Sequence, residues 1–319
     1  MGARARVLAI VAIAAALAAA AVVGVTLLQT RGDKTTAAGA VTKPRAGVPS
    51  LWLDFGVRDD AETRALTGAS RLLADGRLRA AAAVFGRYHS VPAQIGAAFA
   101  RWHDGGLDAV KRVVAAHPDS PVAQFHLGMA YLWSGRVADA VSTWQRLDAR
   151  HPDAPESVEA ENLLYPDLAP GLPLLVTPLT LPSAPTAAAQ LRLLARDASH
   201  PDANAKLRYG TALWRLDRRV SAERQFAAAA RLAPHDPLAL TLAAVGLFSK
   251  RDPVRAFSRL GPLTGVFPRA AVVRLHLGLL LVWTRRPAKG EQQLRLAVRD
   301  EPRSVYAVVA RKILADVSK

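Results

Sequence analysis

Residues 127–152 read LGMAYLWSGRVADAVSTWQRLDARHP. Within this stretch the small residues Gly128 and Ala140 stand among large side chains, and Pro152 closes it. Gly or Ala in the middle of a helix lets a paired helix come close, and large residues fill the space between the two. Proline ends a helix because its ring clashes with the preceding turn and its nitrogen carries no hydrogen. The stretch therefore predicts two closely packed helices that end near Pro152.

Prolines recur along the chain at a spacing of 34 residues. Pro118 and Pro152 are 34 positions apart, and the same step separates consecutive members of the later set Pro234, Pro268 and Pro302. A period of this size is typical of solenoids built from helix pairs. The sequence therefore predicts a repeat array with an insertion between its two parts.

The positions upstream of these prolines resemble the tetratricopeptide repeat (TPR) family. That family places large, small and large residues on the first helix, then a small residue, an aromatic residue and a closing proline. One unit has Leu127-Gly128-x-Ala130-Tyr131, then Ala140, Trp144 and Pro152; another has Tyr209-Gly210-x-Ala212-Leu213, then Ala222, Phe226 and Pro234. The resemblance covers most of residues 60–302 and implies an all-α, TPR-type helical-pair solenoid.

The match to this family is uneven. In residues 95–117 the second helix is short for the family, and Gly261-Pro262 interrupts the second helix of a later repeat. We expect a first helical block in residues 51–164, a second in residues 186–302 and a capping helix in residues 303–319, where Val305, Val308, Val309 and Ile313 share one side.

The N-terminal residues 1–28 predict a transmembrane signal-anchor. Val7 to Leu28 is an uncharged, mostly apolar run that would span about 33 Å as a helix, and Arg4 and Arg6 precede it. A cleavable signal peptide ending near Ala19-Ala20-Ala21 is the alternative. Residues 29–50 then predict a flexible tether. We therefore expect a single-pass membrane protein with an extracytoplasmic body, although the charges on both sides of the span leave its orientation open.

The insertion at residues 165–185 is rich in proline and leucine, with Asp167 as its single charge. Proline forbids helix, and a solvated linker is less apolar than this. Three interpretations remain open at this point. The segment packs against the solenoid as a strap, binds a partner, or forms a hinge between the two helical blocks.

The TPR resemblance also implies a concave groove lined by the first helix of each pair. Carrying the family positions over gives an unusually apolar lining, and exposed patches of this kind mark interaction sites. The predicted lining includes Phe125, Met129, Trp133, Leu207, Trp214, Phe248, Leu279 and Trp283. A groove filled by the chain's own strap or N-terminal segment is the alternative.

Basic residues fall at the turn between the paired helices. The chain carries 42 Lys and Arg against 26 Asp and Glu, a formal net charge of +16. Equivalent turns align in a solenoid, which predicts a basic ridge that attracts anionic lipid or nucleic acid, or else ordinary solvated turns. The ridge residues are Arg136, Arg218, Arg219, Lys250, Arg251, Arg285 and Arg286.

No motif in the sequence points to catalysis. The chain has no cysteine, and its eight histidines form no metal-ligand spacing such as HExxH. Phosphate-binding, dinucleotide-binding and nucleophile-elbow motifs are absent from the sequence as well. We therefore expect a non-enzymatic protein with no cofactor and no metal.

The leading hypothesis is a membrane-anchored scaffold that binds a peptide or helix of a partner protein in its groove. The alternatives are a structural or self-assembling module with an internally filled groove, and a basic surface that binds anionic lipid or, less favoured, nucleic acid. The oligomeric state stays open.

Overall fold

The closing prolines mark helix ends in the computed structural model, which describes residues 43–317. The second helices of the pairs stop two residues before Pro118, Pro152, Pro234, Pro268 and Pro302. Side-chain caps begin several of the following first helices. Ser120 Oγ accepts a hydrogen bond from the amide of Ala123 at 3.3 Å, and Asp202 Oδ1 accepts one from the amide of Asn204 at 2.8 Å. The repeat period of the sequence is thus the period of the helix pairs.

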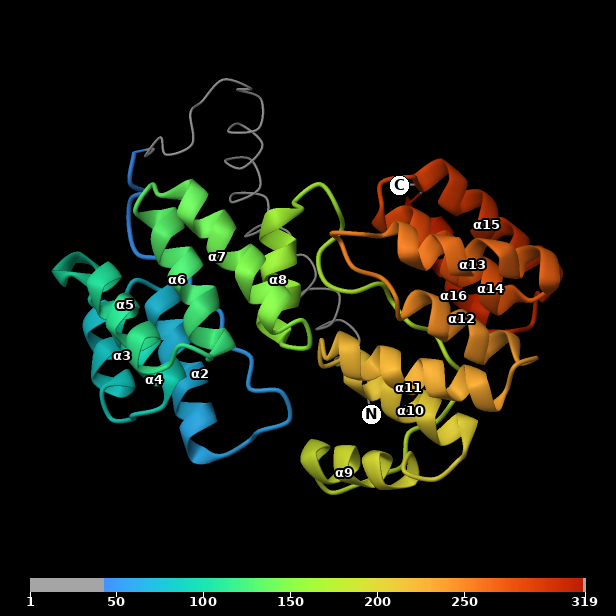
Figure 1. Ribbon diagram of the computed structural model, residues 1–319, viewed down its shortest axis with the longest axis horizontal. Coiled ribbons are helices and arrows are strands. Elements are labelled where there is room, and N and C mark those ends of the chain that lie inside the picture. Colours follow the sequence, from blue (N-terminus) through green and yellow to red (C-terminus); the bar gives the residue numbers. More distant parts are fainter. Residues whose placement is uncertain (1–42, 318–319) are drawn as a thin grey trace. The chain divides into compact units, whose positions relative to one another are not determined.

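The chain divides into two compact units, and we describe each by itself. The described part of the N-terminal unit is residues 43–164, in which three helix pairs are followed by a closing helix (Figure 1). The first pair is α2 (Ala61–Ala74) with α3 (Leu78–Phe85), and the second is α4 (Val91–Ala100) with α5 (Gly106–Ala116). The third is α6 (Pro121–Trp133) with α7 (Val137–Arg150), against which α8 (Pro155–Leu164) packs.

The C-terminal unit repeats this plan in its described residues 165–317, with one additional helix, α9 (Ala187–Asp197), in front (Figure 1). Its pairs are α10 (Ala203–Trp214) with α11 (Arg219–Leu232), α12 (Pro237–Val245) with α13 (Val254–Val266), and α14 (Ala271–Trp283) with α15 (Pro287–Asp300). Helix α16 (Val305–Val317) packs against α14 and α15. The described residues therefore form helices and irregular segments without strands, as an all-α solenoid requires.

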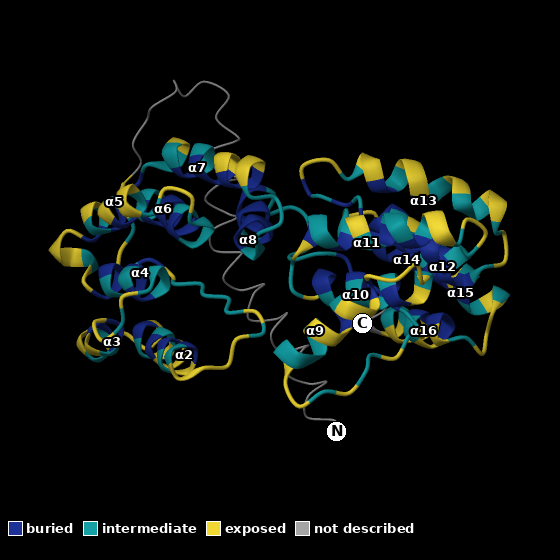
Figure 2. Cartoon of the chain, turned by 60° about the horizontal axis from the view of Figure 1, so that its bottom comes forward, coloured by how far each residue is buried: buried dark blue, intermediate teal, exposed yellow. Residues whose placement is uncertain are grey.

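Glycines in the first helices allow the close approach that the sequence predicted. A Cβ atom added to Gly128 would clash with the indole of Trp144 on α7. One added to Gly210 would lie 2.6 Å from the ring of Phe226, and one added to Gly278 would lie 2.9 Å from Leu294. The partner side chains fill the space that the missing side chains leave, and Trp144, Phe226 and Leu294 are fully buried. Figure 2 shows buried positions along paired helices such as α10 and α11.

Helix α13 corrects one expectation. Pro262 lies inside this helix, which continues from Val254 to Val266. Proline interrupts a helix when its ring clashes and a hydrogen bond is lost. Here Ala256 and Leu260 are buried in the core before Pro262, and Leu263 packs against the same core after it, so tertiary packing holds the helix across the missing bond. The pattern of buried residues overrides the local preference.

The predicted single-pass membrane localisation is also corrected. Among residues 43–317 no helix is long and apolar enough to cross a membrane. The longest helices there, such as α7 and α11, have 14 residues, whereas a span needs about 20. The predicted anchor at residues 1–28 lies outside the described residues, as do residues 29–42 of the predicted tether. The extracytoplasmic placement of the body therefore loses its basis.

Candidate functional site: two strapped helices

An extended segment of the N-terminal unit lies against the first helix of its third pair. We call residues 45–52 strap 1. The amide of Arg45 donates a hydrogen bond to the carbonyl of Trp133 at the end of α6 (2.8 Å), and the guanidinium of Arg45 lies 5.1 Å from the centre of the Trp133 ring. At the other end the amide of Trp52 donates to Nε2 of His126 (3.3 Å). The Trp52 ring contacts that of Phe125 edge to face, with centroids 5.7 Å apart.

His126 receives strap 1 as a neutral imidazole. Its Nδ1 lies 2.7 Å from the carbonyl oxygen of Val122, which can only accept, so Nδ1 carries the proton. Nε2 is then free to accept the hydrogen bond from Trp52. Complete burial lowers the pKa of His126 to about 4. The helix therefore presents a fixed acceptor to the backbone of the strap at neutral pH.

The C-terminal unit holds a second extended segment in the same way. We call residues 169–176 strap 2. The amide of Ala169 donates to the carbonyl of Trp283 at the end of α14 (3.2 Å), and the amide of Val176 donates to Nε2 of His276 (3.1 Å). Nδ1 of His276 lies 2.7 Å from the carbonyl oxygen of Val272. Burial lowers the pKa of His276 to about 4, as it does for its counterpart.

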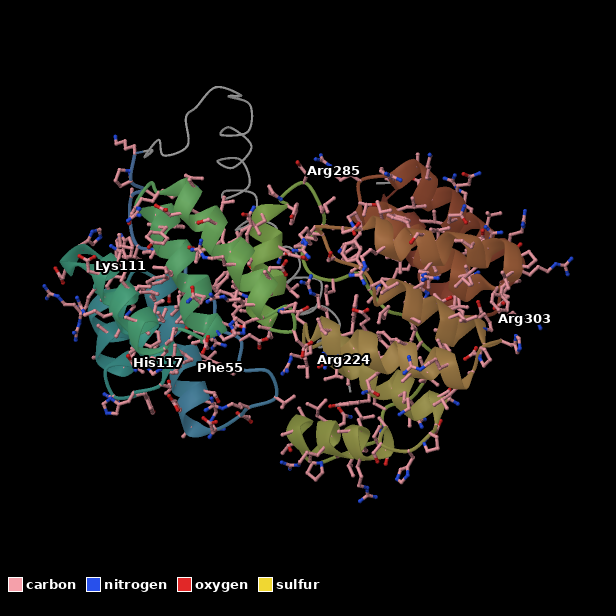
Figure 3. The ribbon with its side chains drawn as sticks, viewed as in Figure 1. Phe55, Lys111, His117, Arg224, Arg285 and Arg303 are labelled. Atoms are coloured by element: carbon pink, nitrogen blue, oxygen red, sulfur yellow. The ribbon has the colours of Figure 1, made fainter. Side chains whose placement is uncertain are left out.

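Strap 2 has additional anchors. The indole nitrogen of Trp214 donates to the carbonyl of Pro173 at 2.8 Å. Leu175 and Val176 are buried in the same apolar core as Leu279. Just before strap 2, Asp167 forms an exposed ion pair of 2.9 Å with Arg285, which is labelled in Figure 3. Of the interpretations left open for residues 165–185, packing as a strap is the one seen for residues 169–176.

Each strap must bend to meet both of its anchors. The two anchored residues of each strap are seven positions apart, a distance of up to about 23 Å in extended chain. Their two anchors on the helix are also seven positions apart, but in α-helix this is a rise of only about 10 Å. Gly47 and Gly171 have φ angles of +74° and +70°, in the left-handed region that other residues enter at a cost. These glycines provide the bend that returns each strap to its helix.

The residues predicted to line a groove therefore lie mostly under the straps or in the core. Phe125 and Met129 are buried on α6, while Trp133 is half-buried. In the C-terminal unit Leu207, Trp214, Phe248 and Leu279 are buried in one cluster, with Trp283 packed at its edge. Phe248 lies in the turn after α12 rather than on a first helix. The two sets belong to different units.

The predicted basic ridge does not form one exposed surface. Arg219 and Lys250 are 8% and 3% exposed. Arg136 is in the N-terminal unit, paired with Asp139 at 2.6 Å, and Arg286 lies over the ring of Phe257. Arg218, Arg251, Arg285 and Arg286 are exposed, so only part of the predicted set is available to a lipid or nucleic-acid surface.

Neither histidine was among the predicted site residues, and strap 1 was foreseen only as an unspecified N-terminal segment that could fill the groove. Two signals in the sequence point to them. His126-Leu127-Gly128 and His276-Leu277-Gly278 share three residues, and Trp133 and Trp283 follow each histidine at the same distance. A Gly-apolar-Pro-x-Leu-apolar pattern occurs in both straps. Neither signal shows by itself that the two segments meet in the fold.

Comparisons with known proteins place TPR proteins as structural neighbours. A TPR protein from Parabacteroides merdae is 12% identical, covering 80% of this chain and 97% of its own, with a TM-score of 0.33. The TPR2AB domain of yeast Sti1 in complex with pHSP90 is 11% identical over 81% and 98%, with a TM-score of 0.31. YrrB, described as a TPR protein with an unusual peptide-binding site, is 13% identical over 79% and 98%, with a TM-score of 0.29. No family model matches the chain, and neither does any curated protein. TM-scores this low leave the repeat assignment resting on the helix pairs themselves.

Proposed function

We propose that this chain is a non-enzymatic protein-interaction scaffold whose first-helix faces hold extended polypeptide segments. One observation carries the proposal. In both units, an extended segment is bound through its backbone to a buried histidine and to a helix-end carbonyl. Backbone recognition of this kind suits an extended ligand, because main-chain hydrogen bonds supply affinity and the side chains that alternate along the segment can supply specificity. The basic turns and the scattered carboxylates offer no comparable arrangement.

The structural alternative, a module with permanently filled grooves, is favoured for the C-terminal unit. There Leu175 and Val176 are 6% and 9% exposed and belong to the core. In the N-terminal unit Leu51 and Trp52 are only half-buried and Ser50 is exposed. We therefore assign partner binding to the N-terminal groove and a structural role to strap 2.

A comparison of captured partners tests this function. The full-length protein would be used as bait in an extract of the cells that express it, beside the variant Arg45→Pro/Trp52→Pro. Proline removes both amide donors of strap 1 and so weakens its hold on α6. Ala46→Pro is the matched control, because Pro170 stands at the equivalent place in strap 2.

We expect the double variant to capture certain partner proteins in larger amounts than the wild type and Ala46→Pro do. Adding His126→Leu to the double variant should abolish capture of the same proteins. Identical partner sets for all folded baits would contradict a role of this groove in partner binding.

A further inference from the structure

The two straps share a sequence pattern as well as a binding mode. Strap 1 reads RAGVPSLW and strap 2 reads APGLPLLV, so glycine is third, proline fifth and leucine seventh in both. The fourth and eighth positions are apolar in both straps. In each case the first amide bonds to the tryptophan carbonyl and the eighth amide bonds to the histidine. If each strap is regarded as the ligand of its groove, the two grooves therefore hold ligands with the same sequence pattern.

The positions that are identical in both straps include residues with a clear structural role. Glycine adopts the positive φ, and Pro49 and Pro173 are buried. The sixth position differs between the straps, and it is exposed in both, with Leu174 48% exposed. A groove that ignores the exposed position and selects the others reads the pattern Gly-apolar-Pro-x-Leu-apolar. Proline also lowers the entropy that the segment loses on binding, because its φ is already fixed.

Strap 1 is held by ring contacts at Arg45 and Trp52, but its C-terminal end is less deeply buried than that of strap 2. In strap 2 the Trp214 indole donates a hydrogen bond to the carbonyl of Pro173. Among the described contacts no such bond reaches the carbonyl of Pro49, the equivalent residue of strap 1. Its leucine and its eighth residue are half-buried, whereas those of strap 2 are buried. The N-terminal groove is thus the one from which a competing segment can displace the resident strap.

We propose that the N-terminal groove, on α6 between His126 and Trp133, binds an extended segment of a partner protein with the pattern Gly-apolar-Pro-x-Leu-apolar, and that strap 1 is its built-in competitor. This inference rests on the proposed scaffold function and names its ligand class. The partner enters by exchanging its own backbone amides for those of Arg45 and Trp52. The apparent affinity is therefore set by how often strap 1 leaves the groove.

A peptide from the chain itself is the sharpest probe. The peptide DLAPGLPLLVTP, residues 167–178, carries the pattern, and a peptide with the same residues in scrambled order does not. Binding of each fluorescently labelled peptide would be measured by anisotropy with the full-length protein, with Arg45→Pro/Trp52→Pro and with the control Ala46→Pro. We expect the double variant to bind the first peptide about tenfold or more tightly than wild type. Ala46→Pro should bind as wild type does, and His126→Leu added to the double variant should abolish binding.

Folding is checked by circular dichroism, and Gly47→Ala replaces the double variant if the latter unfolds. Gly47→Ala keeps the strap's amides and meets no neighbouring atom within 4 Å, so it acts through backbone strain alone. A folded strap variant that binds neither peptide, or both equally, overturns the proposal. Sedimentation that shows dimers by strap exchange, without peptide binding, overturns it too and assigns the groove to a second copy. Partner capture that still depends on strap 1, without any binding of the peptide, would leave the scaffold function in place. The same result would reject the proposed ligand pattern.

Discussion

Single residues decide how closely the helices of a pair approach, and Gly128 is the clearest case. The indole of Trp144 occupies the space where a Cβ of residue 128 would be, and its nitrogen donates to the carbonyl of Phe125 at 3.0 Å. We expect Gly128→Ala to destabilise the protein by about 1–3 kcal/mol through overpacking. Gly68→Ala on α2 is the matched control, since a Cβ there meets nothing within 4 Å. The control should gain about 0.5–1 kcal/mol from helix propensity. Thermal or urea unfolding measures both, and equal effects would contradict the register.

The buried histidines couple stability to pH. The folded pKa of His126 and of His276 is about 4, below the value near 6.5 of an exposed histidine. The unfolded chain therefore takes up protons first, so stability is full above about pH 6.5 and falls as the pH drops towards 4. Each histidine contributes a slope of roughly 1.4 kcal/mol per pH unit in that window. In the folded protein each imidazole becomes protonated only near pH 4, where Nε2 can no longer accept the strap's amide, so strap release is expected at that lower end of the window.

Urea unfolding at several pH values between 7 and 4 measures this slope. The variants His126→Leu and His276→Leu should each have a shallower dependence on pH, although both start from a lower stability because an amide loses its acceptor. His235, exposed after α11, is the control for replacement by leucine. An unchanged slope in both buried-site variants would rule out these histidines as the acid-sensitive groups.

At the scale of elements, sequence reasoning located the helix pairs but not the partner of each extended segment. Glycine and alanine opposite Trp144 and Phe226, with prolines every 34 residues, leave a local and repeated signal. A strap leaves no local signal of this kind in the sequence, because its hydrogen bonds join its backbone to a helix far away along the chain. Trp52 and His126 are 74 positions apart, and Val176 and His276 are 100 apart. The apolar character of residues 165–185 predicted that they pack. Residues 45–50 lack that character and were predicted to belong to the tether, and residues 51 and 52 to begin the first helical block.

The bend in each strap is an element-level property that can be weakened without removing a contact. Gly47→Ala and Gly171→Ala place a Cβ where it meets no atom within 4 Å, but at a φ that disfavours it. The cost is about 1–2 kcal/mol, which should speed local opening of the strap by roughly fivefold or more. Hydrogen exchange at the amides of Trp52 and Val176 measures this.

Gly261→Ala, on α13 and equally free of neighbours, is the control for both strap variants. We expect it to leave exchange at the two strap amides unchanged. If Gly47→Ala left exchange at Trp52 unchanged, strap 1 would not depend on its bend.

At the scale of the whole molecule, the same plan occurs twice. Each unit has a strap, three helix pairs and a closing helix, and in each the strap lies on the first helix of the third pair. The spacing of the prolines predicts the repeat period, but this higher-order duplication was not predicted. Strap 1 falls at residues 45–52, and the corresponding strap 2 falls within what looked like an insertion. The duplicated unit, rather than the single repeat, is thus the natural level at which to describe binding.

A solenoid passes stability from neighbour to neighbour, so its closing helix should protect the preceding pair most. Ala310 on α16 is fully buried, whereas Val308 on the same helix is 54% exposed. We expect Ala310→Glu to cost about 2–4 kcal/mol by burying an unpaired charge, and Val308→Glu to cost little. Hydrogen exchange should quicken most in α16 and the adjacent pair α14–α15, and least in α10, because stability in a repeat array decays along nearest-neighbour contacts. The amide of Val176 should follow α14, since it is bound to His276 on that helix. Uniform acceleration across the C-terminal unit would instead show that it unfolds as one cooperative block, in which case strap 2 reports on the entire unit and not on its own groove.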